Sequence, residues 1–186
     1  MKRIFDLMIS VVLIVVLTIP MLLIIFSVLA TSKGPALYWS RRVGRNNNIF
    51  VMPKFRSMII STPTKATHLL SEPDNFITPV GKFLRRYSLD EFPQLFSVLN
   101  GDMSIVGPRP ALFNQNDLIK LRTEAGVDKL LPGITGWAQV NGRDGISISD
   151  KVELDIEYMF KQSFWFDIKI LWLTLLRVIN KDGVSH

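Results

Sequence analysis

Two adjacent carboxylates, Asp90 and Glu91, are the residues whose types and neighbours most strongly suggest chemistry. Arg85 and Arg86 precede the pair, and Arg109 follows within a stretch rich in glycine and proline at residues 101–110. Arginine binds phosphoryl oxygens through paired hydrogen bonds. A carboxylate can attack phosphorus as a nucleophile, and Mg2+ is commonly held by one or two carboxylates together with substrate phosphates. The combination therefore indicates phosphate chemistry.

The same segment also fits an ordinary helix start. Acidic residues at a helix N-terminus satisfy free backbone amides and complement the helix dipole, and proline is tolerated in the first turn. With Pro93 close behind, a helix that begins near Asp90 and continues to Leu99 would make Asp90 its cap. A glycosidase site does not fit, because its two carboxyl groups face each other across the sugar bond and adjacent residues do not.

The composition narrows the chemistry further. The chain of 186 residues contains no cysteine and only two histidines, His68 and His186, so thiolate chemistry is excluded and a histidine-based site is disfavoured. The formal net charge of +6 favours anionic partners: nucleic acid, an anionic membrane or phosphorylated substrates. We find no basic–aromatic stacking motif or recognition-helix signature, and therefore expect no nucleic-acid partner.

A long apolar segment from Ile4 to Ala30 is the candidate membrane helix, which would hold the acid pair and its arginines near the membrane. As a straight helix it would be about 40 Å long, more than the roughly 30 Å thickness of a hydrocarbon core. Pro20 predicts a kink within it. Basic residues flank both ends, and such flanks prefer the cytoplasm, which favours a bent, re-entrant helix. A helix that spans the membrane is the alternative, and a signal peptide fits poorly because its apolar core is shorter.

The C-terminal segment, Phe164 to Asn180, predicts an amphipathic helix with tryptophans and basic residues. Such helices often lie in the membrane interface, although an ordinary core helix has a similar pattern.

Short elements fill the middle of the chain. We expect strands at 36–39 and 49–52, helices at 78–87, 92–99, 114–124 and 150–160, and loops at 41–48, 61–75 and 101–110, with a short helix near 68–70 and clustered turns at 132–144. The predicted fold class is α+β: a small, mostly helical, membrane-associated domain with few short strands. We expect residues 1–32 to form the re-entrant membrane helix and residues 33–186 to form a domain on the cytosolic face that carries the acid pair and ends in an interfacial helix, with both parts in one structural unit.

Three blocks of sequence carry a resemblance to a known family. They are KFRSM at 54–58, GKFLRRYSLDEFPQLFSVLNGDMSIVGPRP at 81–110 and PGITGWAQVNGRD at 132–144. Through these blocks the chain resembles the monotopic phosphoglycosyl transferases, also called bacterial sugar transferases, over nearly its whole length. SLDEFPQ followed by GDMSIVGPRP is highly specific, and the length corresponds to the minimal catalytic form.

The resemblance implies an activity and a place for it. Asp90 would attack the phosphate that bears the sugar of a UDP-sugar and release UMP, and polyprenyl phosphate, expected to be undecaprenyl phosphate, would then accept the phosphosugar. This reaction initiates a cell-surface glycoconjugate. The resemblance also implies a membrane helix broken at Pro20, contact with membrane lipid, and an active site on the cytoplasmic face of the bacterial inner membrane.

The resemblance further implies roles for individual residues. Glu91 would act beside Asp90 and bind the required Mg2+. The positions that match basic residues of the family, and that would bind substrate, are Lys54, Arg56, Arg85, Arg109 and Arg143. Departures from the family pattern at Ser40, Asn47 and Phe76 bear on sugar or nucleotide contacts, and Thr18-Ile19 before Pro20 bears on how sharply the helix breaks.

Two alternatives to the enzyme remain open at the level of sequence. A non-catalytic, membrane-anchored basic scaffold would use the same charge to bind lipid headgroups. A nucleic-acid binder with a membrane anchor would rest on charge alone. The sequence does not identify the sugar or the pathway, and it leaves open whether the chain forms a homo-oligomer.

Overall fold

The computed structural model of the protein describes residues 2–63, 73–142 and 145–180. The short helix predicted near 68–70 and the site residue Arg143 lie outside the described residues. The helices are α1 (Lys2–Thr31), α2 (Pro79–Arg86), α3 (Gln94–Asn100), α4 (Asn116–Glu124), α5 (Trp137–Asn141), α6 (Ile148–Lys161) and α7 (Phe164–Asn180). The strands are β1 (Leu37–Val43), β2 (Ile49–Phe55), β3 (Ser104–Val106) and β4 (Gly133–Thr135). A mostly helical chain with few short strands is thus confirmed.

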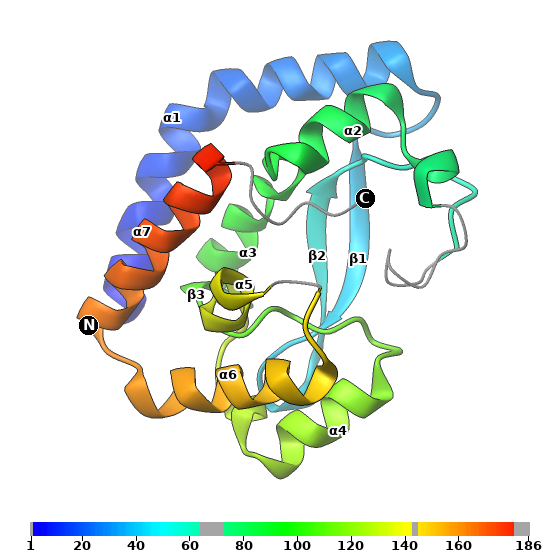
Figure 1. Ribbon diagram of the computed structural model, residues 1–186. Coiled ribbons are helices and arrows are strands. Elements are labelled where there is room, and N and C mark those ends of the chain that lie inside the picture. Colours follow the sequence, from blue (N-terminus) through cyan, green and yellow to red (C-terminus); the bar gives the residue numbers. More distant parts are fainter. Residues whose placement is uncertain (1, 64–72, 143–144, 181–186) are drawn as a thin grey trace.

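Helix α1 is long and apolar enough to cross a membrane, and little of its most apolar window is buried against the rest of the chain. Figure 1 shows that it changes direction: its first part runs along the side of the domain, and its second part crosses over α2. The helix stays continuous from Lys2 to Thr31 with Pro20 inside it. Its buried side is narrow, with Asp6 and Ser10 in the first part and Met21, Ile24 and Val28 in the second.

The remaining surface of α1 is apolar and exposed. The large apolar residues of α1 that are more than half exposed are Ile4, Met8, Val11, Val12, Val15, Val16, Ile19, Leu22, Leu23, Phe26 and Leu29. An apolar face of this length is unusual on a soluble protein and suits contact with lipid.

Strands β1 and β2 form an antiparallel hairpin that is longer than the sequence predicted. The prediction ended the first strand at Trp39, but pairing continues to Val43, and the second strand runs through Pro53 to Phe55. Proline removes one backbone donor, which a two-stranded sheet tolerates because each strand has a free edge. This extension matters for the site, because Lys54 lies on the paired part of β2.

A second, parallel pair joins β3 and β4. The sequence predicted only loops and turns at these positions, and this was wrong. Ser104 pairs with Gly133 and Val106 with Thr135, and an adjacent short helix, α5, was missed as well. Strand β3 is fully buried and leads directly into the loop that carries Arg109.

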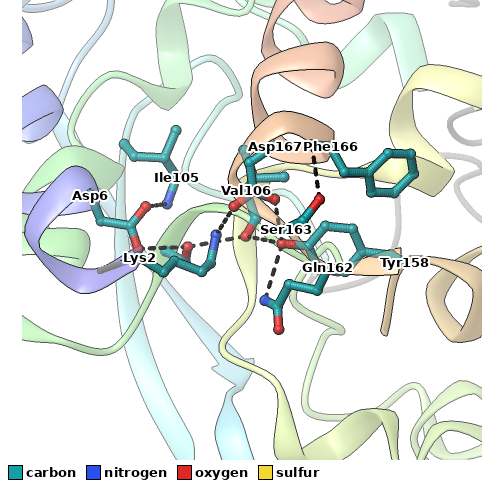
Figure 2. Close-up of polar contacts among 10 residues, drawn as sticks. Lys2, Asp6, Ile105, Val106, Tyr158, Gln162, Ser163, Phe166 and Asp167 are labelled. Carbon is teal, nitrogen blue, oxygen red and sulfur yellow. Dashed lines mark hydrogen bonds and ion pairs between the residues drawn. The ribbon is translucent and has the colours of Figure 1, made fainter. Parts of the chain in front are cut away.

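Polar contacts fasten the start of α1 to β3 and α7, and α7 in turn to α6 (Figure 2). The Asp6 carboxylate accepts hydrogen bonds from Ser104 Oγ at 2.8 Å and from the Ile105 amide at 3.2 Å. Lys2 forms an ion pair of 2.6 Å with Asp167, which also accepts a hydrogen bond of 2.8 Å from the Tyr158 hydroxyl. The start of the apolar helix is therefore part of the same packed unit as β3.

The other end of α1 is fastened to β2. The Arg56 guanidinium donates hydrogen bonds to the backbone carbonyls of Ser32, Lys33 and Gly34, which follow the last turn of the helix. These carbonyls lack partners within a helix, so a buried arginine satisfies them. Both ends of α1 consequently contact the same domain.

Candidate active site

Asp90 and Glu91 lie in a single 3-10 turn, Leu89–Glu91, between α2 and α3. Ser88 precedes the turn in the left-handed conformation, with φ of 55°, which redirects the chain. Helix α3 begins only at Gln94, and Pro93 occupies its N-cap position with no side-chain cap hydrogen bond. The interpretation of Asp90 as the cap of this helix is therefore wrong. Asp90 lies inside the 3-10 turn, four residues before α3 begins, and it is buried.

The Glu91 carboxylate is held by two basic side chains from distant parts of the chain. Lys54 Nζ on β2 lies 2.7 Å from Glu91 Oε1, and Arg109 Nη2 in the loop after β3 lies 2.9 Å from the same oxygen. The Lys54 and Glu91 side chains are mostly buried, while about a third of the Arg109 side chain is exposed. Both of these hydrogen bonds go to Oε1, and among the described residues no hydrogen bond to Glu91 Oε2 is found.

The charges around Glu91 favour its ionised form. Burial alone would raise the pKa of Glu91, but the charges and hydrogen bonds of Arg109 and Lys54 outweigh burial and hold this pKa well below its ordinary value. Burial also lowers the pKa of Lys54, and the charge of Glu91 opposes that effect. Glu91 is thus a fixed anion whose partners are two cations.

Asp90 has the opposite electrostatic character. Burial raises the pKa of its carboxyl group, and the negative charge of Glu91 adds to this effect. The charges of Lys54, Arg85 and Arg109 act against it. Two adjacent acids whose environments push their pKa values apart are suited to different roles, and perturbed pKa values cluster at functional sites.

The structure brings three of the five predicted substrate-binding residues to the acid pair. Lys54 and Arg109 contact Glu91 directly, and Arg85 on α2 is close enough for its charge to act on Asp90. Arg56 is placed elsewhere: its guanidinium is engaged by the carbonyls that follow α1. Arg143 lies outside the described residues.

Gln94 is a residue to which the sequence assigned no role. It lies about one turn after Asp90, it is buried, and its amide nitrogen has no hydrogen-bond partner among the described residues. A buried amide donor without a partner costs stability. The sequence signal was present, since Gln94 belongs to the SLDEFPQ block.

The described residues contain no cluster of three or more acidic or histidine side chains that could hold a metal by itself. Mg2+ usually keeps water and binds one or two carboxylates plus substrate phosphates. Glu91, ionised and with Oε2 unused by the described hydrogen bonds, fits that pattern. A metal at this position would therefore depend on substrate for part of its ligand set.

Acidic side chains in contact with lysine and arginine side chains are found in phosphoryl-transfer enzymes, where the cations stabilise the negative charge of the transferring phosphoryl group. The family model of the bacterial sugar transferases matches residues 1–181, and the chain belongs to this family.

Individual relatives agree with the family assignment. An undecaprenyl-phosphate glucose phosphotransferase from Komagataeibacter xylinus is 41% identical and covers 96% of this chain. An uncharacterized sugar transferase, EpsL, from Bacillus subtilis is 40% identical over 100% of this chain and 91% of its own length. A UDP-glucose:undecaprenyl-phosphate glucose-1-phosphate transferase from Escherichia coli is 38% identical over 97% of this chain. The chain spans only 36% of the K. xylinus protein and 41% of the E. coli protein.

Proposed function

We propose that this protein transfers a sugar-1-phosphate from a UDP-sugar to polyprenyl phosphate, with release of UMP, through a covalent intermediate on Asp90. The observation that carries the proposal is the acid pair itself: a buried Asp90 beside an ionised Glu91 that is bound by Lys54 and Arg109. The names of the relatives, which include glucose and galactose phosphotransferases acting on undecaprenyl phosphate, support the donor and acceptor classes.

The first half of the reaction uses Asp90 as the nucleophile. A carboxylate oxygen of Asp90 bonds to the phosphorus that carries the sugar, and the bond from that phosphorus to the UMP oxygen breaks. UMP leaves, and the phosphosugar stays on Asp90 as an acyl phosphate. Lys54, Arg85 and Arg109 lie around the acid pair, where their charges can offset those of the diphosphate.

The second half restores the enzyme. A phosphate oxygen of polyprenyl phosphate bonds to the same phosphorus, the bond to Asp90 breaks, and the carboxylate is regenerated. Covalent catalysis splits one difficult step into two easier ones. It also allows one site to serve a water-soluble donor and a lipid acceptor in turn.

Glu91 is proposed to bind Mg2+ together with substrate phosphates. The ion would supply charge neutralisation at the diphosphate and the leaving group. Glu91 also keeps Lys54 and Arg109 in place through its Oε1 atom. Its low pKa keeps it ionised in both halves of the reaction.

Helix α1 is proposed to enter the cytoplasmic leaflet of the bacterial inner membrane and return on the same side, bent at Pro20. Both of its ends contact the catalytic domain, through Asp6 at the start and through Arg56 at the end, while its exposed surface is apolar. The exposed Trp165 and Trp172 on α7 suit the membrane interface. This location would bring Asp90 near the depth of the lipid phosphate, where synthesis of a cell-surface glycoconjugate begins.

The test is release of UMP by purified protein supplied with Mg2+ and a panel of UDP-sugars, first without and then with undecaprenyl phosphate. We expect at least one donor to give UMP, with sustained turnover only when acceptor is present. Asp90→Asn should release none. A non-catalytic basic scaffold predicts no UMP from any donor, and that result would reject the proposed function.

A further inference from the structure

The loop that carries Arg109, residues 107–111, is held at every position by a different backbone or side-chain partner. Three of the contacts join backbone groups: the Gly107 amide donates to Thr135 O at 2.9 Å, the Gly133 amide donates to Pro108 O at 2.9 Å, and the Val43 amide donates to Ala111 O at 2.9 Å. Two arginine side chains supply the others. Arg122 Nη1 donates to Arg109 O at 2.8 Å, and Arg42 Nη1 donates to Pro110 O at 3.1 Å. Proline fixes φ at two of the five positions. The main chain at Arg109 therefore has little freedom.

Arg122 is the partner of the central position, and it is itself held by a buried acid. Its Nε and Nη2 atoms lie 2.9 and 2.6 Å from Asp155 Oδ2 on α6. The Arg122 side chain is 9% exposed and that of Asp155 is 1% exposed. The rigid fork of a guanidinium leaves Nη1 to donate to Arg109 O. The pair thus joins α4, α6 and the loop.

The surroundings of Arg122 argue against a direct role in binding substrate. It lines a cavity of about 30 Å3 together with Pro108 and Pro110 of the loop. That volume has room for about one or two water molecules, whereas ligand sites are usually about 300 Å3 or larger. Arg122 therefore contacts the main chain of Arg109, whereas Glu91 contacts its side chain.

The Arg109 side chain links the Arg122–Asp155 pair to the acid pair. Arg109 is bound through its carbonyl oxygen by Arg122 and binds Glu91 Oε1 through its own Nη2. A residue that must meet a phosphate at a defined distance needs such support, because a displacement of about 1 Å can cost about 100-fold in rate. Buried ion pairs add little net stability, so a positioning role accounts for this pair better than stability alone.

We propose that Arg122 and Asp155 are positioning residues that fix the main chain of Arg109, and thereby its guanidinium, for transfer of the phosphosugar. The kinetic part of this inference rests on the function proposed above. Asp155 orients Arg122, Arg122 holds the Arg109 carbonyl, and neither contacts substrate.

The test is a double-mutant cycle on the rate of UMP release. Arg122→Lys removes the fork that bonds Asp155 and the Arg109 carbonyl at once, and we expect it to lower the rate about 10- to 100-fold. In an Arg109→Ala background the same change should cost less than about 3-fold, because no side chain is left to position. Lys120→Gln, an exposed residue on the same helix, is the matched control and should leave the rate unchanged.

A second readout does not depend on turnover. In Arg122→Lys we expect amide hydrogen exchange to accelerate in the segment 107–113 and to stay unchanged in α3. If Arg122→Lys does not fold, the cycle is run with Asp155→Asn, whose amide oxygen can still accept hydrogen bonds from Arg122 but carries no negative charge.

Four results would each overturn the inference. In the cycle, they are a wild-type rate in Arg122→Lys, or an equal loss of rate from this change with and without Arg109→Ala. The others are unchanged hydrogen exchange in the loop and loss of the fold in both Arg122→Lys and Asp155→Asn. The proposed function fails separately, if the unmodified protein releases no UMP.

Discussion

Arg109 Nη2 and Glu91 Oε1 lie 2.9 Å apart, although the two residues are 18 positions apart in the sequence. Lys54 Nζ approaches the same oxygen to 2.7 Å from a third part of the chain. One carboxylate oxygen therefore joins the 3-10 turn, strand β2 and the loop after β3. The contact fixes the cations of the site relative to Asp90 before any substrate arrives.

Glu91→Gln should lower the rate of UMP release by about 100-fold or more and raise the Mg2+ concentration needed for half-maximal rate. The change removes the negative charge that would hold the metal and leaves Lys54 and Arg109 without their anionic partner. Titration of the rate with Mg2+ measures both effects. Glu124→Gln, an exposed member of an ion pair on α4, serves as the control. An unchanged Mg2+ dependence in Glu91→Gln would argue against the role given to Glu91.

The rate at which the covalent intermediate forms should fall at acid pH, with the midpoint of this acid limb above pH 3.8, the ordinary pKa of an aspartate. Burial raises the pKa of Asp90, which must be ionised to attack phosphorus, so the rate increases as pH rises through this pKa. Lys54→Met removes a positive charge that favours the carboxylate, and it should move the limb to higher pH.

The measurement is the rate of the first half-reaction from about pH 3.5 to pH 8 at constant ionic strength. Lys120→Met, at an exposed position, should leave the limb in place. A limb at or below pH 3.8, or a shift to lower pH in Lys54→Met, contradicts the electrostatic account of Asp90.

Asp6→Asn should lower the free energy of unfolding by about 1–3 kcal/mol, because the buried carboxylate accepts hydrogen bonds from both Ser104 and Ile105. An asparagine amide keeps one oxygen to accept from Ile105 and loses the charged acceptor that faces Ser104, whose hydroxyl then has only the Val106 carbonyl to donate to. Thermal unfolding in detergent measures the change, with the exposed Glu153→Gln as control. Equal stability of the two variants would show that the start of α1 is not fastened to β3.

Cysteines placed at Lys2 and Lys33 should react with a membrane-impermeant reagent from the cytoplasmic face only. Lys2 is the first residue of α1 and Lys33 follows its end, both ends of the helix contact the same domain, and the natural chain has no cysteine that would react in the background. Inverted vesicles expose the cytoplasmic face to the reagent, and intact spheroplasts expose the opposite face, so labelling of the two preparations tests each side separately. Reaction of the two positions from opposite faces would establish a spanning helix and exclude the re-entrant one.

Local sequence signals predicted several elements well. The helices predicted at 78–87, 92–99, 114–124 and 150–160 agree with α2, α3, α4 and α6 to within two residues at each end. In the structure, Thr78 and Ser147 cap α2 and α6 through their hydroxyl oxygens, and Gly101 ends α3 in the left-handed conformation, with φ of 95°. These features depend on residues close together in the chain. The acid pair and its nearby arginines could be found for the same reason.

The elements that were missed depend on distant partners. Strands β3 and β4 have three residues each, and they pair across about thirty positions of sequence, so neither has a local pattern of its own. Arg56 matches a family motif, yet only the fold shows that its guanidinium binds the carbonyls that follow α1. The Lys54–Glu91 contact likewise needs the hairpin and the 3-10 turn in place.

The most direct test of the account is the intact mass of the protein after incubation with Mg2+ and an active UDP-sugar in the absence of lipid acceptor. We predict a mass increase equal to one sugar-1-phosphate less one water, located on Asp90, absent in Asp90→Asn and removed when undecaprenyl phosphate is added. Sustained turnover by a protein that never carries this adduct on Asp90 would contradict the account.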